Sequence, residues 1–483
     1  MDLVSRAARL FGNAPFLLSG GERLSFGRCA SISSHIAGKL HENGLRAGDT
    51  LAIAAPNSVQ SVLLTMALLR SGIVCAPMNH RFPEARLLAG LQALRPELVV
   101  TDETTAMLKR SPFRTERLAN LVDLKNSTPQ EALPFSVPLH KNRPVTVIHT
   151  SASSGNPKAA LHSFANHWYS ALGAARNMPL GTGDCMLLSL PLFHIGGYAI
   201  LFRALVSGCA MALPEPLEPL EKSLERFPVT HLSLVPTQLH RLFGEPTACQ
   251  SLRELKAVLL GGSATPVPLL EQSVRQKIPV YLTYGSTEMS SQIATTRGPV
   301  TTAEEACAVV LPFREVRIGE ENEILVRGAC LFQGYVHEKR LLLPIDSDGW
   351  FHTGDTGRLD HNGKLLVQGR KDNMFISAGE NLHPEEIEQV LVSIEGVLEA
   401  VVVPSPDSEY GWRPVAFIRT ETRDTPRDCD ISGELLKTVG KLKTPVRYTR
   451  VSEWKKLPGS QKIDRKWYQT TTFSAPVTPD ASE

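Results

Sequence analysis

The sequence predicts an α/β protein. A large N-terminal domain of two helix-covered, largely parallel sheets with a small β-rich subdomain precedes a small α+β C-terminal domain. Short apolar and β-branched runs alternate with helical patterns between residues 50 and 283, which is typical of parallel sheets covered by helices. Short alternating segments broken by turns replace this pattern between residues 313 and 369. Because 483 residues exceed one ordinary core, we place the domains at residues 1–370 and 371–483, with the β-rich subdomain at about 295–370.

The first clear unit along the chain is a βαβ unit. An apolar strand is predicted at residues 51–55, a helix at 59–69 and a second strand at 73–76. A further short strand is predicted at residues 98–101. Residues 112–143 are polar and rich in proline without a clear period, which predicts a surface connection.

A hydroxyl-rich loop from Thr150 to Lys158 reads Thr-Ser-Ala-Ser-Ser-Gly-Asn-Pro-Lys. The β-branched and apolar residues 145–148 predict a strand before it, and Ser163 predicts the cap of a helix over residues 164–176 after it. Spare backbone N–H groups, hydroxyls and one ammonium suit a polyphosphate. The stretch is not a Walker A loop, because no Gly-Lys-Ser/Thr opens the helix. A polar surface loop is the alternative interpretation.

Strands and helices continue to alternate after this loop. Five strands are predicted at residues 186–190, 210–213, 231–235, 255–260 and 280–283, and four helices at 194–206, 218–226, 237–243 and 266–274. Further on, Asn362-Gly363 marks a hairpin. The C-terminal part is predicted to hold a helix over 385–391 started by Pro384, strands at 400–403 and 415–418, a helix at 431–439 and a frayed tail from Thr470.

The composition is that of a soluble globular protein. A formal net charge of +2 argues neither for a nucleic-acid partner nor for an anionic membrane surface, and we expect no nucleic-acid partner and no membrane insertion. The eight cysteines lie far apart without a Cys-x-x-Cys pair, which indicates reduced core cysteines rather than a zinc site or a disulfide framework. No signal-peptide pattern or membrane-spanning run is present, so we expect a soluble, cytoplasmic protein.

Three further stretches carry side chains that suit a nucleotide. Tyr284-Gly-Ser-Thr-Glu288 follows a strand end, where open α/β sheets bind ligands, and it offers a stacking ring, a hydroxyl and a carboxylate for Mg²⁺. Asp355 suits the two hydroxyls of a ribose, and Arg370 suits a phosphate or a neighbouring acid. Lys462 lies in a glycine-bearing C-terminal stretch and suits a developing negative charge. Taken singly, each is equally an ordinary turn, ion pair or surface residue.

The order of these motifs resembles the adenylate-forming superfamily, which comprises acyl- and aryl-CoA synthetases, adenylation domains of peptide synthetases and firefly luciferase. The resemblance runs from the first βαβ unit to about Lys466. It implies ATP, Mg²⁺ and coenzyme A as ligands and a small-molecule carboxylic acid as substrate. The positions that it assigns to ATP are Thr150, Ser151, Ser153, Ser154, Gly155, Lys158, Gly262, Ser263, Tyr284, Gly285, Thr287, Asp355 and Arg370. Ala152 stands where the family usually has a glycine, so the loop is expected to be stiffer.

The resemblance also implies catalytic roles. Glu288 is expected to bind Mg²⁺, and Lys462 to bridge the acyl carboxylate and the α-phosphate during adenylation. His194 matches the aromatic gate between the acyl pocket and the thiol tunnel. Gly379, within Gly-Glu-Asn, matches the tunnel-side loop. Asp372 matches the hinge about which a mobile C-terminal domain rotates.

Within the superfamily, residues 188–194, 233–239 and 256–263 look like the 2-succinylbenzoate–CoA ligase branch of menaquinone biosynthesis. This resemblance implies a ligase that converts 2-succinylbenzoate, ATP and CoA to 2-succinylbenzoyl-CoA, AMP and pyrophosphate, with Gly261 beside the acid. The alternatives are another aryl- or acyl-CoA ligase, a stand-alone adenylation enzyme that loads a carrier protein, and a non-catalytic nucleotide-binding protein.

Arg203 is a candidate for recognition of the substrate. It interrupts a helical pattern that is apolar on most sides, so its charge needs a partner. An internal ion pair or a side chain that reaches the surface would explain it. The implied substrate offers another explanation, because its benzoate carboxylate must be held without reacting. Ser233 and Thr283, at strand ends near the same pocket, would add hydrogen bonds.

Overall fold

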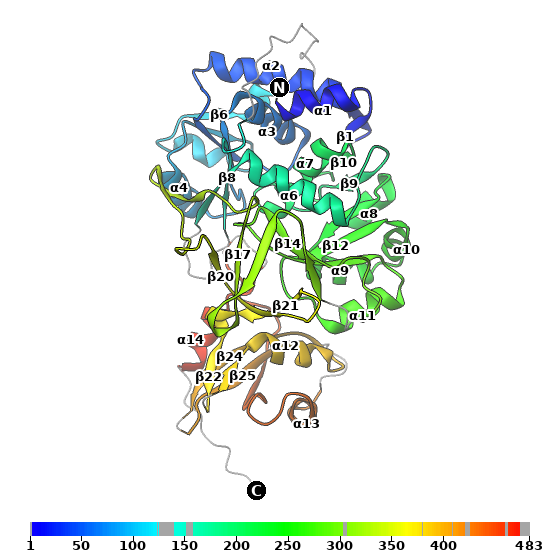
Figure 1. Cartoon of the computed structure of the whole chain (residues 1–483), viewed down its shortest axis with the longest axis vertical. Coiled ribbons are helices and arrows are strands. Elements are labelled where there is room, and N and C mark those ends of the chain that lie inside the picture. The colour runs from blue at the N-terminus through cyan, green and yellow to red at the C-terminus, as the bar shows by residue number, and fades with distance from the viewer. Residues whose placement is uncertain are drawn as a thin grey trace. The chain divides into compact units, whose positions relative to one another are not determined.

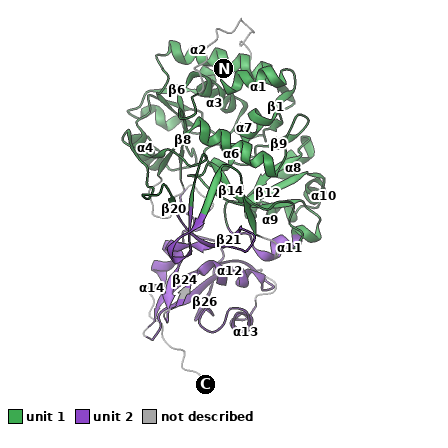
Figure 2. Cartoon of the chain, in the orientation of Figure 1, with its two compact units in different colours: residues 1–263, 273–316, 326–351 green, residues 264–272, 317–325, 352–483 purple. Residues whose placement is uncertain are grey.

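A computed structural model describes residues 2–122, 124, 140–150, 158–302, 307–378, 380–407, 409–420, 426–458 and 462–473. The chain forms two compact units, coloured separately in Figure 2. Unit 1 comprises residues 1–263, 273–316 and 326–351, and unit 2 comprises residues 264–272, 317–325 and 352–483. Short segments of the β-rich region and of one helix therefore belong to unit 2. The predicted boundary at residue 370 stays a prediction.

One sheet of unit 1 has the strand order β19-β18-β8-β7-β4-β3-β5-β6. The five strands from β7 to β6 are parallel, whereas β8, β18 and β19 are antiparallel. The bounds are β3 (Thr50–Ala54), β4 (Val74–Pro77), β5 (Leu98–Thr101), β6 (Thr115–Arg117), β7 (Pro144–His149), β8 (Ala159–Ser163), β18 (Gly334–His337) and β19 (Arg340–Leu342).

The other sheet contains, within unit 1, the order β15-β14-β13-β12-β11-β9-β10-β1-β2. The strands from β13 to β1 are parallel, and β2, β14 and β15 are antiparallel to their neighbours. The bounds are β1 (Pro15–Ser19), β2 (Glu22–Ser25), β9 (Cys185–Leu187), β10 (Ala210–Ala212), β11 (His231–Leu234), β12 (Ala257–Gly261), β13 (Val280–Ser286), β14 (Ser291–Thr295) and β15 (Ala308–Val310).

Helices cover these sheets, as Figure 1 shows. One continuous core joins apolar side chains of α1, α2, α3 and α7 to both sheets. Because the strands are buried on both faces, they are almost continuously apolar. The helices are α1 (Leu3–Phe11), α2 (Phe26–Glu42), α3 (Val59–Ser71), α4 (Glu84–Leu94), α5 (Leu118–Leu121), α6 (Phe164–Asn177), α7 (Ile195–Ser207), α8 (Leu220–Arg226), α9 (Pro236–Phe243) and α10 (Pro246–Glu254). Helix α11 (Val267–Arg275) crosses the unit boundary.

Unit 2 is a smaller α+β unit. Strands β20 (Phe351–Leu359) and β21 (Lys364–Arg370) form the predicted hairpin, and Gly363 adopts φ +72° in its turn. Beyond it, α12 and α13 pack on a three-stranded sheet around a separate apolar core. The bounds are β22 (Phe375–Ser377), β23 (Glu380–Leu382), α12 (Pro384–Ser393), β24 (Val397–Asp407), β25 (Gly411–Thr420), α13 (Asp428–Thr438), β26 (Tyr448–Arg450) and α14 (Arg465–Phe473).

The predicted fold class is confirmed, with local corrections. The loop from Thr150 to Lys158 was expected to join a strand to a helix, but β8 follows it and pairs with β7 before α6 begins. The connection at 112–143 contains β6 and α5, and Leu118 and Leu121 of α5 are buried. The tail was expected from Thr470, yet α14 continues to Phe473 and buries Thr472. Residues 474–483 lie outside the described part.

Candidate active site

The two ends of the predicted phosphate loop meet where β7 and β8 pair. The Thr150 N–H donates to the Lys158 carbonyl at 2.8 Å, and the Lys158 N–H lies 3.3 Å from the Thr150 hydroxyl. Lys158 is exposed, and its ammonium stands 5.0 Å from the centre of the Tyr335 ring. The antiparallel pairing thus places the two ends of the loop side by side, with the Thr150 hydroxyl at the Lys158 backbone N–H. The remaining predicted loop residues, Ser151, Ser153, Ser154 and Gly155, lie outside the described residues, as does Ala152.

The predicted magnesium ligand lies in the turn that follows β13. The Tyr335 hydroxyl donates to Glu288 Oε1 at 2.6 Å. The carbonyl of Thr287 lies 2.7 Å from Nε2 of the buried His162. This short contact fixes the backbone of the turn. Burial lowers the pKa of His162 to about 4, so its neutral ring carries the donated hydrogen on Nε2.

The ends of β12 and β13 approach each other closely. Gly261 pairs with Thr283, and a Cβ at Gly261 would stand 2.6 Å from the Thr283 carbonyl oxygen. Gly262 has φ +87°, and both Gly262 and Ser263 are exposed. The chain therefore leaves the sheet here through a conformation that favours glycine. Backbone groups at this strand end are open to a ligand, as the topology of open sheets requires.

Tyr284 and Gly285 continue β13 into the turn. A Cβ at Gly285 would lie 2.0 Å from the Ser291 carbonyl oxygen, so only glycine allows β13 and β14 to approach this closely. The register shifts between Tyr284 and Gly285. Tyr284 is partly exposed beside this irregularity. Bulges of this kind are common next to binding sites, where they change the direction of a side chain.

Arg203 lies on α7 with 3% exposure. It donates to Gln292 Oε1 at 2.8 Å and reaches the Ser291 hydroxyl at 3.4 Å. No acid pairs with it among the described residues. Burial and the nearby Arg314 guanidinium lower its pKa to about 10. Neither an ion pair nor a side chain that reaches the surface accounts for this charge.

The other predicted acid-binding residues lie on elements around Arg203. Gln292, the partner of Arg203, donates to Thr295 at 2.8 Å and also contacts the Thr283 hydroxyl at 3.4 Å. Ser233 on β11 has a buried hydroxyl without a hydrogen-bond partner among the described residues. His194 is exposed at the start of α7, and its ring contacts Phe193. The Thr283 hydroxyl itself donates to the Ala294 carbonyl at 3.1 Å, so among the two predicted hydroxyls it is that of Ser233 that is left without such a partner in the described part of the chain.

In unit 2, Asp355 and Arg370 are register partners in the β20–β21 hairpin. Arg370 donates to Asp355 at 3.0 Å and to Asp372 at 3.3 Å. Burial would lower the pKa of Arg370, but these two carboxylates together raise it. The structure therefore brings three predicted residues into one cluster. Asp372 itself is exposed in the short turn of residues 371–373.

Lys462 is also in unit 2, where its carbonyl accepts from Leu457 at 2.9 Å. Its side chain is exposed. Gly379 lies outside the described residues. The roles of Lys462 as the adenylation lysine, of Asp372 as the hinge and of Gly379 as a tunnel residue stay predictions.

The magnesium prediction fits the residues present. No cluster of three or more His, Cys, Asp or Glu side chains suited to a metal occurs in the described ranges. Mg²⁺ at nucleotide sites is usually held by one or two carboxylates together with phosphates and water. Glu288, with one carboxylate oxygen engaged by Tyr335, matches that requirement. When bound with ATP, the ion would neutralise phosphate charge during adenylation.

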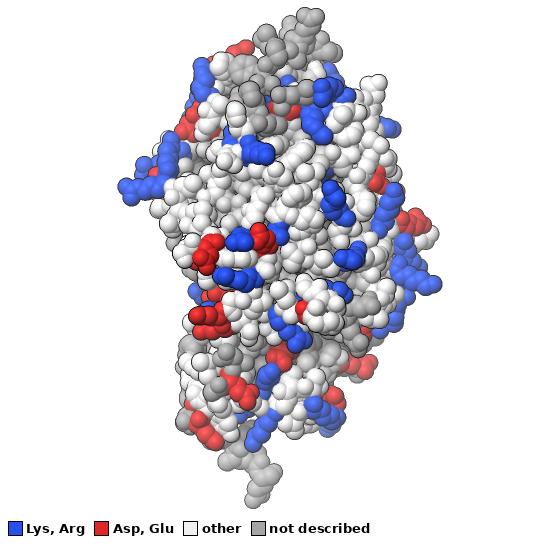
Figure 3. All heavy atoms as spheres, in the orientation of Figure 1, with Lys and Arg blue, Asp and Glu red and all other residues white. Residues whose placement is uncertain are grey.

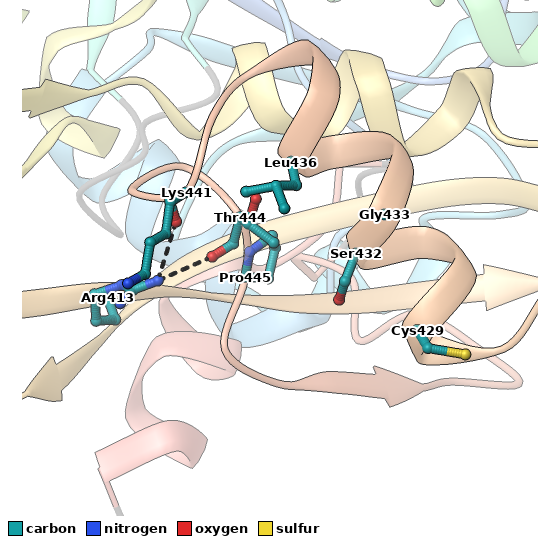
Figure 4. Close-up of a pocket in the computed structure, with 8 residues that line it drawn as sticks. All are labelled: Arg413, Cys429, Ser432, Gly433, Leu436, Lys441, Thr444 and Pro445. Atoms are coloured by element: carbon teal, nitrogen blue, oxygen red, sulfur yellow. Dashed lines mark hydrogen bonds between the residues drawn. The ribbon is translucent and has the colours of Figure 1, made fainter.

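A pocket of about 430 Å³ lies in unit 2 between α13 and residues 440–445 (Figure 4). None of the predicted site residues lines it. Arg413, on its wall, donates to the carbonyl groups of Lys441 and Thr444, both at 3.3 Å. Its guanidinium therefore serves to hold this loop.

Three expectations from the composition concern the cysteines, membrane-spanning helices and the charged surface. All eight cysteines are unpaired, and six of them are buried. In the parts of the chain that the structure describes, no helix has the length and apolar character needed to cross a membrane. On the face drawn in Figure 3, acidic and basic side chains are intermixed.

Comparison with known families identifies an enzyme that activates an acid with a nucleotide. Residues 4–336 match the AMP-binding enzyme family and residues 386–461 match the AMP-binding enzyme C-terminal domain. The chain belongs to the AMP-binding enzymes.

Among its relatives, 2-succinylbenzoate–CoA ligase of Salmonella typhimurium is 35% identical over 94% of each chain. The solved o-succinylbenzoate CoA synthetase of Bacillus subtilis, in complex with its acyl-adenylate intermediate, has a TM-score of 0.87 and 26% identity, covering 97% of this chain and 98% of that one. The same enzyme with ATP and magnesium has a TM-score of 0.85 and 26% identity over 96% and 98%.

Three residues that contact the predicted site were not found from the sequence. Tyr335, His162 and Gln292 contact Glu288, Thr287 and Arg203, respectively. Each partner lies far away along the chain or belongs to another element. Tyr335 follows Gly334 in an alternating strand, and that pattern by itself predicts only a half-buried ring.

Proposed function

We propose that this chain is an ATP-dependent acid–CoA ligase that acts on 2-succinylbenzoate in the cytoplasm. In the first half-reaction, the succinyl carboxylate attacks the α-phosphate of ATP to give an acyl-adenylate and pyrophosphate. In the second, the CoA thiol attacks the mixed anhydride, and the products are 2-succinylbenzoyl-CoA and AMP. Positioning and charge stabilisation dominate the first step, because phosphoryl and adenylyl transfers need little covalent work from the protein.

Each of the predicted site residues has a separate role in this reaction. Lys158 and Thr150 hold the pyrophosphate half of ATP, and Glu288 holds Mg²⁺. Asp355 binds the ribose hydroxyls, and Arg370 fixes that carboxylate through the 3.0 Å contact between them. Lys462 places a positive charge between the acyl carboxylate and the α-phosphate.

The choice of 2-succinylbenzoate as the acid substrate rests on the environment of the Arg203 side chain. Its guanidinium is buried and contacts only neutral side-chain acceptors among the described residues. A second buried guanidinium, that of Arg314, adds positive potential. Burial of an unpaired charge is costly, and an anionic ligand would offset that cost. 2-Succinylbenzoate keeps one carboxylate after the other is activated, so it supplies such an anion throughout the reaction.

The test is ATP–pyrophosphate exchange across a panel of aromatic and aliphatic acids, followed by thioester detection with CoA. We expect exchange with 2-succinylbenzoate to exceed that with monocarboxylic analogues, and CoA to accept the acyl group. Equal exchange with a monocarboxylic aryl acid would assign the chain to another aryl-CoA ligase. Transfer to a carrier-protein thiol but not to CoA would contradict the proposed acceptor.

A further inference from the structure

One aromatic side chain contacts both charged groups that the proposed function assigns to the pyrophosphate and its metal. Tyr335 donates from its hydroxyl to Glu288 Oε1 at 2.6 Å, and the Lys158 ammonium lies 5.0 Å from its ring centre. Within the described part of the chain, Lys158 and Glu288 form no ion pair with each other. We propose that Tyr335 is a positioning residue that presents the Glu288 carboxylate to Mg²⁺ and keeps Lys158 from pairing with it. This inference rests on the proposed function.

The fold fixes the position of the tyrosine from several sides. In β18 its backbone pairs with Ala160 of β8 on one side and with Leu342 of β19 on the other. Its ring meets the buried Phe332 ring edge-on, with the centroids 4.8 Å apart. A ring packed in this way keeps its hydroxyl at one place, so the hydrogen bond to Glu288 costs little additional ordering.

The backbone around Glu288 is held by the same pair of strands. The Phe332 N–H, just before β18, donates to the Glu288 carbonyl at 2.7 Å. His162, on β8, contacts the Thr287 carbonyl at 2.7 Å. The turn that carries the metal ligand is therefore fixed at two carbonyl groups and at one carboxylate oxygen.

Because Tyr335 donates to Oε1 of Glu288, the other carboxylate oxygen remains for a metal. A donor that engages one carboxylate oxygen orients the other, and Mg²⁺ tolerates little deviation from octahedral geometry. Partners of metal ligands typically contribute about 10–100-fold to metal affinity or activity. The Tyr335 hydroxyl is such a partner.

The ring has a second effect. A lysine held over an aromatic face is attracted by the ring quadrupole, while the hydroxyl at the ring edge holds the carboxylate. Two opposite charges are thereby kept at different points of one side chain. Without the ring, Lys158 and Glu288 would be able to neutralise each other, and neither would be available to MgATP.

Binding of a non-hydrolysable ATP analogue, without any acid, tests the inference in the full-length protein. Calorimetric titrations at a series of Mg²⁺ concentrations give the half-saturating Mg²⁺ concentration. We expect Tyr335→Phe, which keeps the ring, to raise it about 10–100-fold and to leave AMP affinity unchanged. Tyr335→Leu, which removes the ring, should also weaken metal-free binding of the analogue about two- to fivefold.

Two controls separate positioning from a general defect. Tyr169→Phe removes the hydroxyl of a tyrosine whose ring packs on Phe313 in the same unit, and it should leave the Mg²⁺ dependence at the wild-type value. In a Glu288→Gln background, Tyr335→Phe should cause no further shift, because the carboxylate through which it acts is absent.

The outcomes distinguish this inference from the proposed function. An unchanged Mg²⁺ midpoint for Tyr335→Phe, with the analogue still bound, overturns the role of Tyr335. The role of Tyr335 is also overturned if Tyr335→Phe shifts the Mg²⁺ midpoint equally in the wild-type and Glu288→Gln backgrounds. If the wild-type protein shows no Mg²⁺-dependent binding of the analogue, the proposed function fails instead.

Discussion

Two arginines, the partly buried Arg465 and the buried Arg203, are satisfied in different ways. Arg465 in unit 2 contacts both carboxylate oxygens of Glu388. Arg203 in unit 1 contacts the amide oxygen of Gln292 instead. An amide satisfies the hydrogen-bonding requirement but leaves the charge unbalanced. This difference at the level of single residues distinguishes a structural ion pair from a site that suits an anion.

Arg203→Leu should reduce kcat/KM for 2-succinylbenzoate at least tenfold. Loss of one partner of a desolvated ion pair costs about 3–5 kcal/mol, which corresponds to about two to three and a half decades at 1.4 kcal/mol per decade. A water-mediated contact would cost less. Steady-state kinetics with 2-succinylbenzoate and with an analogue that lacks the benzoate carboxylate provide the measurement. The analogue should lose much less, and ATP binding should persist. An equal loss for both acids would make Arg203 a structural residue.

Replacement of His167 should make the free energy of unfolding fall less steeply as the pH decreases. His167 stacks on Phe202, and burial lowers its pKa well below the ordinary value. Because its folded-state pKa is depressed, its contribution is fully present above the unfolded pKa of about 6.5 and is lost as the pH falls below that value. The loss amounts to at most about 1.4 kcal/mol per pH unit for one histidine. His167→Phe should remove this dependence.

Urea unfolding of the wild type and His167→Phe between pH 7 and about pH 4.5 measures this effect. The free energy of unfolding should fall less steeply with decreasing pH in the variant. His240→Gln, which removes an exposed histidine, is the matched control and should retain the wild-type slope. A slope for His167→Phe equal to that of the wild type would mean that His167 is already protonated in the folded state or does not influence stability.

At the scale of elements, the connection between β13 and β14 is the most constrained part of the candidate site. Ser290 and Ser291 both adopt positive φ, at 55° and 104°. Non-glycine residues in this region store strain, which surrounding contacts must offset. The Ser290 hydroxyl donates to the Cys330 carbonyl at 3.0 Å, and its own carbonyl accepts from Ser170 at 2.6 Å. The turn that carries Thr287 and Glu288 is thus held from both sides.

Gly285→Ala should disrupt this connection. The new Cβ would lie 2.0 Å from the Ser291 carbonyl oxygen, so β13 and β14 must separate, and overpacking of this kind costs about 1–3 kcal/mol or more. We expect a lower melting temperature and weaker MgATP binding. Gly298→Ala is the control, since a Cβ at that position would have no neighbour within 4 Å among the described residues and the φ of Gly298 is ordinary. Equal melting temperatures for the two variants would contradict the close approach.

Elements with strong local signals were predicted from the sequence. Strand β3 and helix α3 have continuous apolar or helical patterns, and Ser163 caps α6 through a reciprocal bond with Asn166. Strand β8 was missed, because Ala159 and Ala160 begin it and alanine is depleted in strands. No element was assigned before Thr50, although α1 and α2 are both amphipathic. Strand β8 was thus decided by tertiary packing, whereas the helical patterns of α1 and α2 were present in the sequence and were left unassigned.

The site was predictable only in part for the same reason. Motifs that are contiguous in sequence, such as the one around Glu288, were identified from their residue types and order. The contact between Tyr335 and Glu288 spans 47 positions, and the one between His162 and Thr287 spans 125. Such contacts depend on which strands become neighbours, which no local pattern specifies. The neutral partner of Arg203 was unpredictable for this reason too.

At the scale of the whole molecule, the predicted catalytic and ATP-binding residues are divided between the two units. Lys158, Thr287 and Glu288 belong to unit 1, whereas Asp355 and Lys462 belong to unit 2. A reaction with two half-reactions can use such a division, because one unit can present different residues to the other in each step. Rotation about Asp372 remains a prediction.

Lys462→Ala should separate the two half-reactions. Adenylate formation should be nearly abolished, because no charge bridges the acyl carboxylate and the α-phosphate. Thioester formation from a supplied acyl-adenylate should remain close to the wild-type rate. Single-turnover assays of each step provide the comparison, and Lys466→Ala, a substitution at another exposed lysine of the same unit, is the control. Equal loss in both steps, with the fold intact, would contradict the assigned role.

The difference in exposure between the cysteines offers a way to observe a rotation of unit 2. Burial raises the pKa of Cys29, Cys75 and Cys185 to about 12, and the reactive species of cysteine is the thiolate. Cys429, at the start of α13, is the exposed cysteine, and Figure 4 shows it on the pocket wall of unit 2. A maleimide dye should therefore label the native chain preferentially at this position. Its fluorescence anisotropy would then report the tumbling of unit 2 during turnover, without an engineered attachment point.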